Sequence, residues 1–356
     1  MTNTPTMHAT LFTPLALGAA LTLPNRVVMA PMTRRRADAD NVPSPLAAEY
    51  YAQRASAGLV IGEATLVTKS GASSPGSPGI YSDAQERAWS HVAQAIHTAG
   101  GRLFIQLWHA GRFSDPAFLD GEVPVGPSAV AIDGELDTPN GRHRFVTPRA
   151  LAAAEIASIV EAYAAAAARA IRAGCDGVEI HAAQGYLIDQ FLRDGSNHRT
   201  DAWGGDPSGR SRLLVEIVAA VSARIGAERI GVQLSPTSPL GGMRDSDPRA
   251  TFGYAAQRLA EARVAYLHLF DPQREWAELR ARFSGAIIAN GGYDGASAAA
   301  AIERGDADLV SFGRPFIANP DLVERIAGNI PFATPDPSTF YGGGARGYID
   351  YARCVR

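Results

Sequence analysis

The chain has 356 residues, of which 46% are hydrophobic and 19% are charged, and its formal net charge is −3. This composition is typical of a soluble globular protein, and the charge gives no reason to expect a nucleic acid or an anionic membrane as partner. The two cysteines, Cys175 and Cys354, form no disulfide framework, which favours a cytoplasmic location.

The N-terminus, MTNTPTMHAT, lacks the cationic segment and apolar core of a signal peptide. No apolar run reaches the roughly 18 residues that a membrane span requires. The eight histidines are scattered and occur in no HxH or HExxH pattern, so we expect no metal site.

Eight short apolar runs recur along the chain and are predicted to be strands: Arg26–Pro31, Leu59–Ala64, Leu103–Trp108, Gly177–His181, Ile230–Ser235, Tyr266–Phe270, Ala286–Asn290 and Leu309–Gly313. Helical patterns separate them, as at Glu155–Ala173, where apolar residues form one stripe. Eight strands alternating with helices predict a (β/α)8 barrel, an α/β fold. A doubly wound sheet is the alternative, although it usually has fewer strands.

Two segments depart from an even barrel. Residues 111–150 form a stretch rich in Pro, Gly and Asp between the third and fourth strands, which we interpret as a cap over the barrel mouth. Residues 331–356 form an irregular, proline-containing tail whose aromatic residues are expected to pack on the body. No linker or second domain is apparent, so residues 1–356 are interpreted as a single domain.

Polar side chains follow the ends of the first three strands: Thr33, Glu63 with Ala64, and Gln106 with His109 and Arg112. In a barrel these side chains meet at one mouth, where ligands bind. Gln106 is also interpretable as a core amide with a partner. For His109 and Arg112, a structural role is as well supported as a catalytic one.

The fourth strand ends in His181, and Gln184 and Tyr186 follow on the turn into a helix. His181 and Gln184 can both donate to one acceptor, such as a carbonyl oxygen, and Tyr186 can give a proton to an adjacent atom. The alternative is a backbone-satisfied histidine, a surface glutamine and a packed tyrosine.

A phosphate site is indicated after the last two strands. Asn290, Gly291 and Gly292 end the seventh strand, and Gly313 and Arg314 end the eighth. Glycines let backbone N–H groups approach a phosphate, and an arginine adds a bidentate cation. Turn glycines beside a surface arginine are the alternative interpretation.

The order of these motifs resembles the old yellow enzymes, which are FMN-dependent ene-reductases. The resemblance runs almost end to end, from LFTPLALGAALTLPNRVVMAPMTR through FIQLWHAGR, AGCDGVEIHAAQGYLIDQFL and VSFGRPFIANPDLV to FYGGGARGYIDY. It implies a (β/α)8 barrel with FMN across the mouth and NADPH or NADH as the reductant.

The resemblance also implies roles for individual residues. Those expected to contact the flavin ring are Ala30, Pro31, Met32, Thr33, Ala64, Gln106 and Gln233. Those expected to hold the phosphate are Asn290, Gly291, Gly292, Gly313 and Arg314. His181 and Gln184 would bind the substrate oxygen, Trp108 and Tyr351 would shape the substrate side, and Tyr186 would be the proton donor.

The implied reaction is reduction of the C=C bond of an alkene activated by a carbonyl or nitro group. NAD(P)H reduces FMN, the flavin N5 delivers hydride to the β-carbon, and Tyr186 protonates the α-carbon from the opposite face.

The chain departs from the family pattern at two positions in this site. Gln184 stands where the family carries Asn or His, and Gln233 stands where it carries an arginine in a motif resembling VRLSP. Gln233 supplies no positive charge near the flavin N1–C2 edge, so we expect a lower flavin potential than in members with arginine. Smaller departures are Trp203, Gly209 and a short segment between Phe270 and Phe283.

Two alternatives to ene-reduction are a flavoenzyme of the same fold with a specialised biosynthetic role, such as isomerisation or desaturation, and a flavin-free barrel that binds a phosphorylated ligand. The expected partner is a small-molecule substrate, without nucleic acid or membrane, for a monomer or homodimer.

Overall fold

Eight parallel strands form a closed barrel in the computed structural model, which describes residues 8–18, 21–275 and 278–354. The barrel strands are β3 (Val27–Met29), β4 (Leu59–Leu66), β5 (Leu103–Trp108), β10 (Gly177–His181), β11 (Ile230–Leu234), β12 (Tyr266–Phe270), β13 (Ala286–Asn290) and β14 (Leu309–Phe312). Neighbours in the chain are neighbours in the barrel, and β14 closes it by pairing with β3. All eight predicted strands and the (β/α)8 fold are therefore confirmed.

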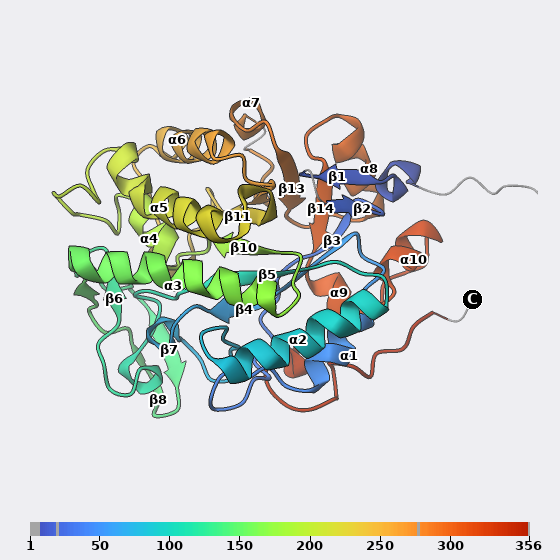
Figure 1. Ribbon diagram of the computed structural model, residues 1–356, viewed down its shortest axis with the longest axis horizontal. Coiled ribbons are helices and arrows are strands. Elements are labelled where there is room, and N and C mark those ends of the chain that lie inside the picture. The colour runs from blue at the N-terminus through green and yellow to red at the C-terminus, as the bar shows by residue number, and fades with distance from the viewer. Residues whose placement is uncertain (1–7, 19–20, 276–277, 355–356) are drawn as a thin grey trace, which may run out of the picture.

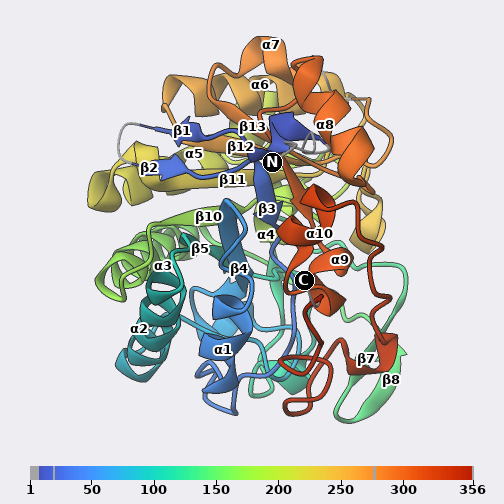
Figure 2. The ribbon, with the colours of Figure 1, turned by 90° about the vertical axis from the view of Figure 1, so that its right-hand side faces the viewer.

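Helices connect the strands and cover the outside of the barrel (Figures 1 and 2). They are α1 (Leu46–Ala52), α2 (Asp83–Thr98), α3 (Ala153–Arg172), α4 (Leu187–Leu192), α5 (Pro207–Ile225), α6 (Pro248–Glu261), α7 (Leu279–Arg282), α8 (Gly295–Glu303), α9 (Arg314–Ala318) and α10 (Leu322–Ala327). The predicted stripe of α3 is its buried face, as Ile156, Ile159 and Tyr163 show. None of the described helices is long and apolar enough to cross a membrane.

The barrel interior changes from apolar to polar along the strands. At the amino-terminal end, Phe104, Tyr266 and Leu309 pack with residues of a small antiparallel pair, β1 (Leu15–Leu17) and β2 (Leu21–Leu23). This pair was not predicted from the sequence, and it closes the bottom of the barrel with leucines. Polar side chains appear only further along the strands, so the bottom of the barrel is a dry core and the mouth is left for chemistry.

The insertion at residues 111–150 contains four short strands: β6 (Val125–Gly126), β7 (Glu135–Thr138), β8 (Gly141–Arg144) and β9 (Arg149–Ala150). β7 and β8 form an antiparallel hairpin, and β6 pairs with β9. Phe113, at the start of the insertion, contacts Phe145 and also Tyr186 from the barrel, with ring centroids 5.2 and 5.6 Å apart. The insertion thus has structure of its own and reaches the barrel mouth.

The tail returns to the body of the protein, as its aromatic residues predicted. Tyr348 is fully buried and stacks on Tyr50 of α1 with a centroid separation of 4.1 Å. Arg34 and Arg36, in the loop after β3, donate to tail carbonyls that include Gly347 and Gly344. Residues 1–7, where no signal peptide is expected, and the last two residues of the tail lie outside the described residues.

Candidate active site

His181 is the last residue of β10 and lies in the barrel mouth. Its side chain is buried, and its Nδ1 has no hydrogen-bond partner among the described residues. Burial, with a smaller contribution from His268, lowers the pKa of His181 to about 3, so the ring is neutral near pH 7. A buried polar atom without a partner requires explanation, and a ligand oxygen at this position would supply the missing contact.

Gln184 lies on the turn between β10 and α4, with φ at +59°. Its backbone N–H donates to Ser235 Oγ at 2.7 Å, and its side-chain Oε1 accepts from Ser238 Oγ at 2.9 Å. Both serines lie just after β11. Because Oε1 is engaged, the NH2 group of Gln184 is left to donate to a further partner.

Tyr186 stands at the start of α4, among aromatic rings. Its centroid lies 5.0 Å from that of His181 and 5.1 Å from that of Trp108, both edge-on. Burial raises the pKa of Tyr186 to about 12, with Arg35 opposing the increase and Tyr341 adding to it. The phenol is therefore protonated at neutral pH. The structure brings His181 and Tyr186 into contact, whereas the contacts of Gln184 are with the two serines after β11.

Trp108, the last residue of β5, is buried, and its Nε1 has no partner within the described part of the chain. Gln106, two residues earlier, donates from Nε2 to Glu179 Oε1 at 2.8 Å and to Gln233 Oε1 at 3.0 Å. Ala64 of β4 is paired in register with Gln106. The residues expected at the flavin ring therefore come from adjacent strands of one mouth.

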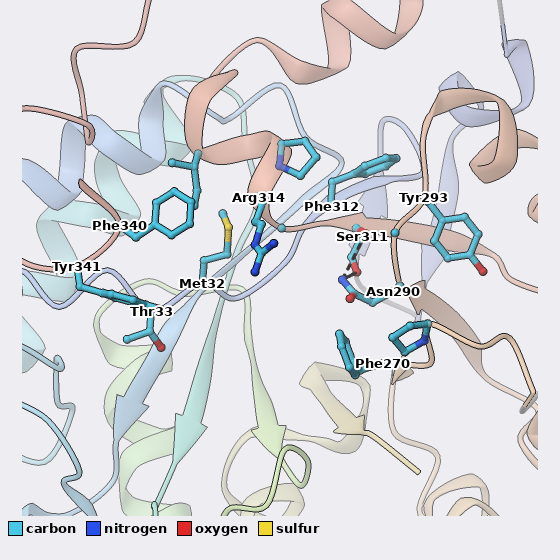
Figure 3. A pocket seen from close by; sticks show the side chains of 16 residues that line it. Met32, Thr33, Phe270, Asn290, Tyr293, Ser311, Phe312, Arg314, Phe340 and Tyr341 are labelled. Atoms are coloured by element: carbon cyan, nitrogen blue, oxygen red, sulfur yellow. Dashed lines mark hydrogen bonds between the residues drawn. The ribbon is translucent and has the colours of Figure 1, made fainter. Parts of the chain in front are cut away.

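A cavity of about 580 Å³ opens at the β13–β14 side of this mouth (Figure 3). The expected cofactor residues that line it are Met32, Thr33, Asn290, Gly291, Gly292, Gly313 and Arg314. Ala30 and Pro31 immediately precede this set, and the N–H of Ala30 donates to Phe312 O at 3.0 Å. The predicted phosphate residues from the ends of two strands are thus neighbours in space.

The backbone at Gly291 leaves room for a phosphate to approach the cavity wall closely. Gly291 has φ at +145°, and a Cβ at this position would lie 2.7 Å from Pro272 Cα, so no larger residue fits. Arg314 points its guanidinium into the cavity, as Figure 3 shows, and it has no acidic partner within the described ranges. A free cation beside glycine backbone is the donor set that a phosphate requires. The residues present fit FMN.

The tail contributes two cavity residues that the motif analysis did not select, Phe340 and Tyr341. Tyr341 is 58% exposed, and Arg35 lies over its ring at 4.8 Å. Tyr351, which was expected on the substrate side, does not line this cavity, and its hydroxyl accepts from the Asp336 N–H at 3.0 Å. The sequence did contain a signal for Phe340 and Tyr341, because they are the first two residues of the family-like motif FYGGGARGYIDY.

His109 and Arg112 take structural positions. His109 Nδ1 accepts from the Gly111 N–H at 3.0 Å, and burial lowers the pKa of this histidine to about 4. Arg112 donates to Val130 O and to Gly241 O, which joins the insertion to the loop after β11. Of the two interpretations left open by the sequence, these contacts support the structural one.

Glu63, on β4 beside Ala64, holds the loop that carries Thr33. Its Oε2 accepts from the backbone N–H groups of Arg34 and Arg35 at 2.8 and 3.2 Å. Burial raises the pKa of Glu63 to about 7, and the two backbone hydrogen bonds oppose this effect. A group that titrates near neutral pH therefore supports one wall of the cofactor cavity.

The model of the NADH:flavin oxidoreductase / NADH oxidase family matches residues 10–332. A probable flavin mononucleotide-dependent alkene reductase of Leishmania infantum is 42% identical, over 95% of this chain and 96% of the relative. Morphinone reductase in complex with tetrahydroNAD is 47% identical with a TM-score of 0.93, over 97% of this chain and 98% of that chain. The old yellow enzyme homologue from Zymomonas mobilis is 44% identical with a TM-score of 0.93, over 96% and 99%.

Proposed function

The chain belongs to the NADH:flavin oxidoreductase / NADH oxidase family, that of the old yellow enzymes, and from this premise we propose how its site residues share the reaction. It is an FMN-dependent oxidoreductase that uses NAD(P)H to reduce the C=C bond of an activated alkene. Because the family depends on FMN, the alternative of a flavin-free barrel that binds a phosphorylated ligand is excluded. The residue roles that follow are our proposal.

Two donors polarise the substrate. His181 and the NH2 group of Gln184 hydrogen-bond the carbonyl or nitro oxygen of the alkene, which makes the β-carbon electrophilic. The observation that carries this assignment is the contact from Ser238 to Gln184 Oε1, because it leaves the amide NH2 group to donate to another acceptor. Gln184 thereby keeps the donor function that the family assigns to Asn or His.

Bound FMN supplies the redox chemistry, accepting hydride from NAD(P)H and giving it to the β-carbon. Tyr186 gives its phenolic proton to the α-carbon, which completes the saturated product. Trp108 and Phe113 pack edge-on against the ring of Tyr186 and hold the phenol in place. Trp108 and Tyr351 shape the substrate side of the flavin in this proposal, and Tyr341, which lines the cofactor cavity, joins them.

The cofactor is held by three sets of groups. Thr33, Ala64, Gln106 and Gln233 contact the ring, and Ala30, Pro31 and Met32 form the wall beside it. Arg314 and Asn290 bind the phosphate together with the backbone at Gly291, Gly292 and Gly313. The phosphate residues line one cavity together with Met32 and Thr33, which supports this part of the assignment.

Residues 1–356 act as one domain in which residues 111–150 cap the mouth, a proposal supported by the contact of Phe113 with Tyr186. The two free cysteines support a cytoplasmic protein, and the net charge of −3 supports action on small molecules without nucleic acid or membrane. The proposed reductant is NADPH or NADH, and the proposed assembly is a monomer or homodimer.

The deciding experiment is anaerobic reduction of the FMN-loaded protein by NADPH and then NADH, followed at the flavin absorbance maximum, with cyclohexenone added afterwards. Bleaching and enone-driven reoxidation are expected. Bleaching without reoxidation would contradict the roles of His181 and Gln184 and favour the specialised biosynthetic role. No bleaching by either nucleotide would overturn the reductase function.

A further inference from the structure

A buried acid–base pair lies inside the barrel, beneath the cofactor site. Glu179 of β10 and His268 of β12 both have 0% exposed side chains, and Glu179 Oε2 lies 2.9 Å from His268 Nδ1. Neither residue has a role in the reaction proposed above. A buried carboxylate is costly unless it is fully paired, so its presence in the barrel requires a reason.

The neighbours of this pair indicate which of its atoms donates and which accepts the hydrogen bond. His268 Nε2 lies 2.8 Å from Ser311 Oγ, which accepts from Asn290 Nδ2 at 2.6 Å. The Ser311 hydroxyl faces two acceptors, Ala289 O at 3.4 Å and His268 Nε2 at 2.8 Å, and the shorter contact assigns its proton to Nε2. The ring N–H of His268 then lies on Nδ1, facing Glu179. In this arrangement both Glu179 oxygens accept hydrogen bonds, Oε1 from Gln106 and Oε2 from His268.

An acceptor-only carboxylate dictates how the neighbouring amides lie. Glu179 Oε1 is 2.8 Å from the Gln106 amide, so Gln106 must point its NH2 group inward and its carbonyl oxygen toward the mouth. The same NH2 group reaches Gln233 at 3.0 Å, so Gln233 must face it with Oε1. The NH2 group of Gln233 is then left as a donor, 3.5 Å from His268.

We propose that Glu179, held by His268, is a positioning residue that sets the amide orientations of Gln106 and Gln233 for FMN. The proposal rests on the cofactor roles given above for these two glutamines. It gives Gln106 an acceptor and Gln233 a donor at the mouth, which complements a flavin edge carrying both an N–H group and carbonyl oxygens. Gln233 acts here without the charge of an arginine, so its orientation is decisive.

The first test is binding of FMN to the apoprotein of Glu179→Gln, measured by quenching of flavin fluorescence. A glutamine at position 179 can present either end to Gln106, so the amide orientations become mixed. The dissociation constant for FMN is expected to rise about tenfold to 100-fold, with about tenfold for each misaligned amide. Asp189→Asn is the matched control, an isosteric change at an equally buried carboxylate paired with Arg193, and should change FMN binding by less than about twofold.

A double-mutant cycle with Gln106→Leu separates orientation from general structural damage. If Glu179 acts through the amide of Gln106, then Glu179→Gln changes FMN binding by less than about twofold in the Gln106→Leu background. Multiplicative losses would overturn the proposal, and so would an unchanged affinity of Glu179→Gln alone. If Gln106→Leu itself binds FMN normally, the assignment of Gln106 to the cofactor site fails instead.

A neutron structure of the unaltered holoenzyme tests the same inference where the variant does not fold. Deuterons on Gln106 Nε2 are expected toward Glu179 and Gln233, with one on His268 Nδ1. A deuteron on the Glu179 carboxyl group, or the carbonyl oxygen of Gln106 turned toward it, would overturn the proposal.

Discussion

The phenol of Tyr186 is positioned by neighbouring rings and tuned by a nearby cation. Because its pKa is raised to about 12 by burial, Tyr186 remains protonated across the range in which the enzyme can be assayed. Arg35 lies close enough to oppose this shift. A donor of this kind acts in one protonation state, so its contribution does not vary with pH.

Tyr186→Phe is expected to lower the rate of enone-driven flavin reoxidation by about 10²-fold to 10⁴-fold, the usual contribution of a general acid. The rate of flavin reduction by NADPH should stay within about twofold, because no proton from Tyr186 enters that step. Stopped-flow measurement of the two half-reactions from about pH 5 to about pH 10 checks both statements. A break near neutral pH in the unaltered enzyme that disappears in the variant would contradict the assignment.

Ser238→Ala should leave Gln184 free to turn its amide. One net hydrogen bond is worth about 1 kcal/mol, so we expect KM for cyclohexenone to rise about fivefold, with little change in the NADPH half-reaction. Thr237→Ala is the neighbouring control, since Thr237 Oγ1 contacts the exposed loop residue Gln273. Equal effects of the two substitutions on KM would show that Gln184 does not depend on Ser238.

Gln233→Arg restores the charge that the family carries near the flavin. The reduced flavin holds negative charge, so the midpoint potential should rise in this variant and stay near its original value in Gln233→Met, which adds no charge. Potentiometric titration of the holoenzymes provides the comparison. A lower or unchanged potential for Gln233→Arg would contradict the expectation that Gln233 accounts for a lower potential in this chain.

At the scale of single elements, the loop after β3 depends on a group that titrates. Glu63 accepts from two backbone N–H groups of this loop, which follow Thr33 in the chain. Its pKa in the folded state, about 7, lies above the ordinary value of 4.5 for a glutamic acid side chain. The proton that the folded state retains therefore stabilises it below about pH 4.5, and this stabilisation is lost as the pH rises through about 7.

Glu63→Gln should remove this pH dependence, because glutamine mimics the protonated acid at every pH. Relative to the variant, the free energy of unfolding of the unaltered protein is expected to fall by about 3 kcal/mol between about pH 4.5 and about pH 8. Urea unfolding of both apoproteins across this range measures the difference. A constant difference between the two curves would mean that the pKa of Glu63 is not raised in the folded state.

At the scale of the whole molecule, the cofactor site joins distant parts of the chain. Thr33, Gln106, Gln233, Asn290 and Arg314 are contributed by strand ends spread around the barrel. A ligand that contacts all of them binds the folded state and not the unfolded chain. Cofactor binding and global stability are therefore coupled.

Removal of FMN is expected to lower the free energy of unfolding by about 2.7 kcal/mol relative to protein in FMN at 100 times its dissociation constant. Chemical unfolding of apoprotein and holoprotein measures this loss. Arg314→Ala should reduce the gain at a fixed FMN concentration, because it weakens binding. If FMN left the unfolding free energy unchanged, the proposed residues would not form its site.

Much of the fold and of the site could be predicted from local patterns. The eight strands, their order and the His181–Tyr186 turn are encoded by apolar runs and by the polar residues that end them. In a closed parallel barrel all such ends meet at one mouth, so the strand register alone indicated that Thr33 and Arg314, which both line the cavity, lie close together.

Only the tertiary structure decided how these groups are tuned. Several of the deciding contacts are between residues far apart in the chain. Glu179 pairs with His268, Ser238 donates to Gln184, and the β1–β2 pair packs on Phe104 and Tyr266 at the bottom of the barrel. The pKa of Glu63 is raised by burial, which also depends on the folded chain. Which tail residue lines the cavity was likewise decided by the fold: Tyr341 lines it and Tyr351 does not. Orientation and acidity depend on burial and on partners across strands, and no local spacing carries that information.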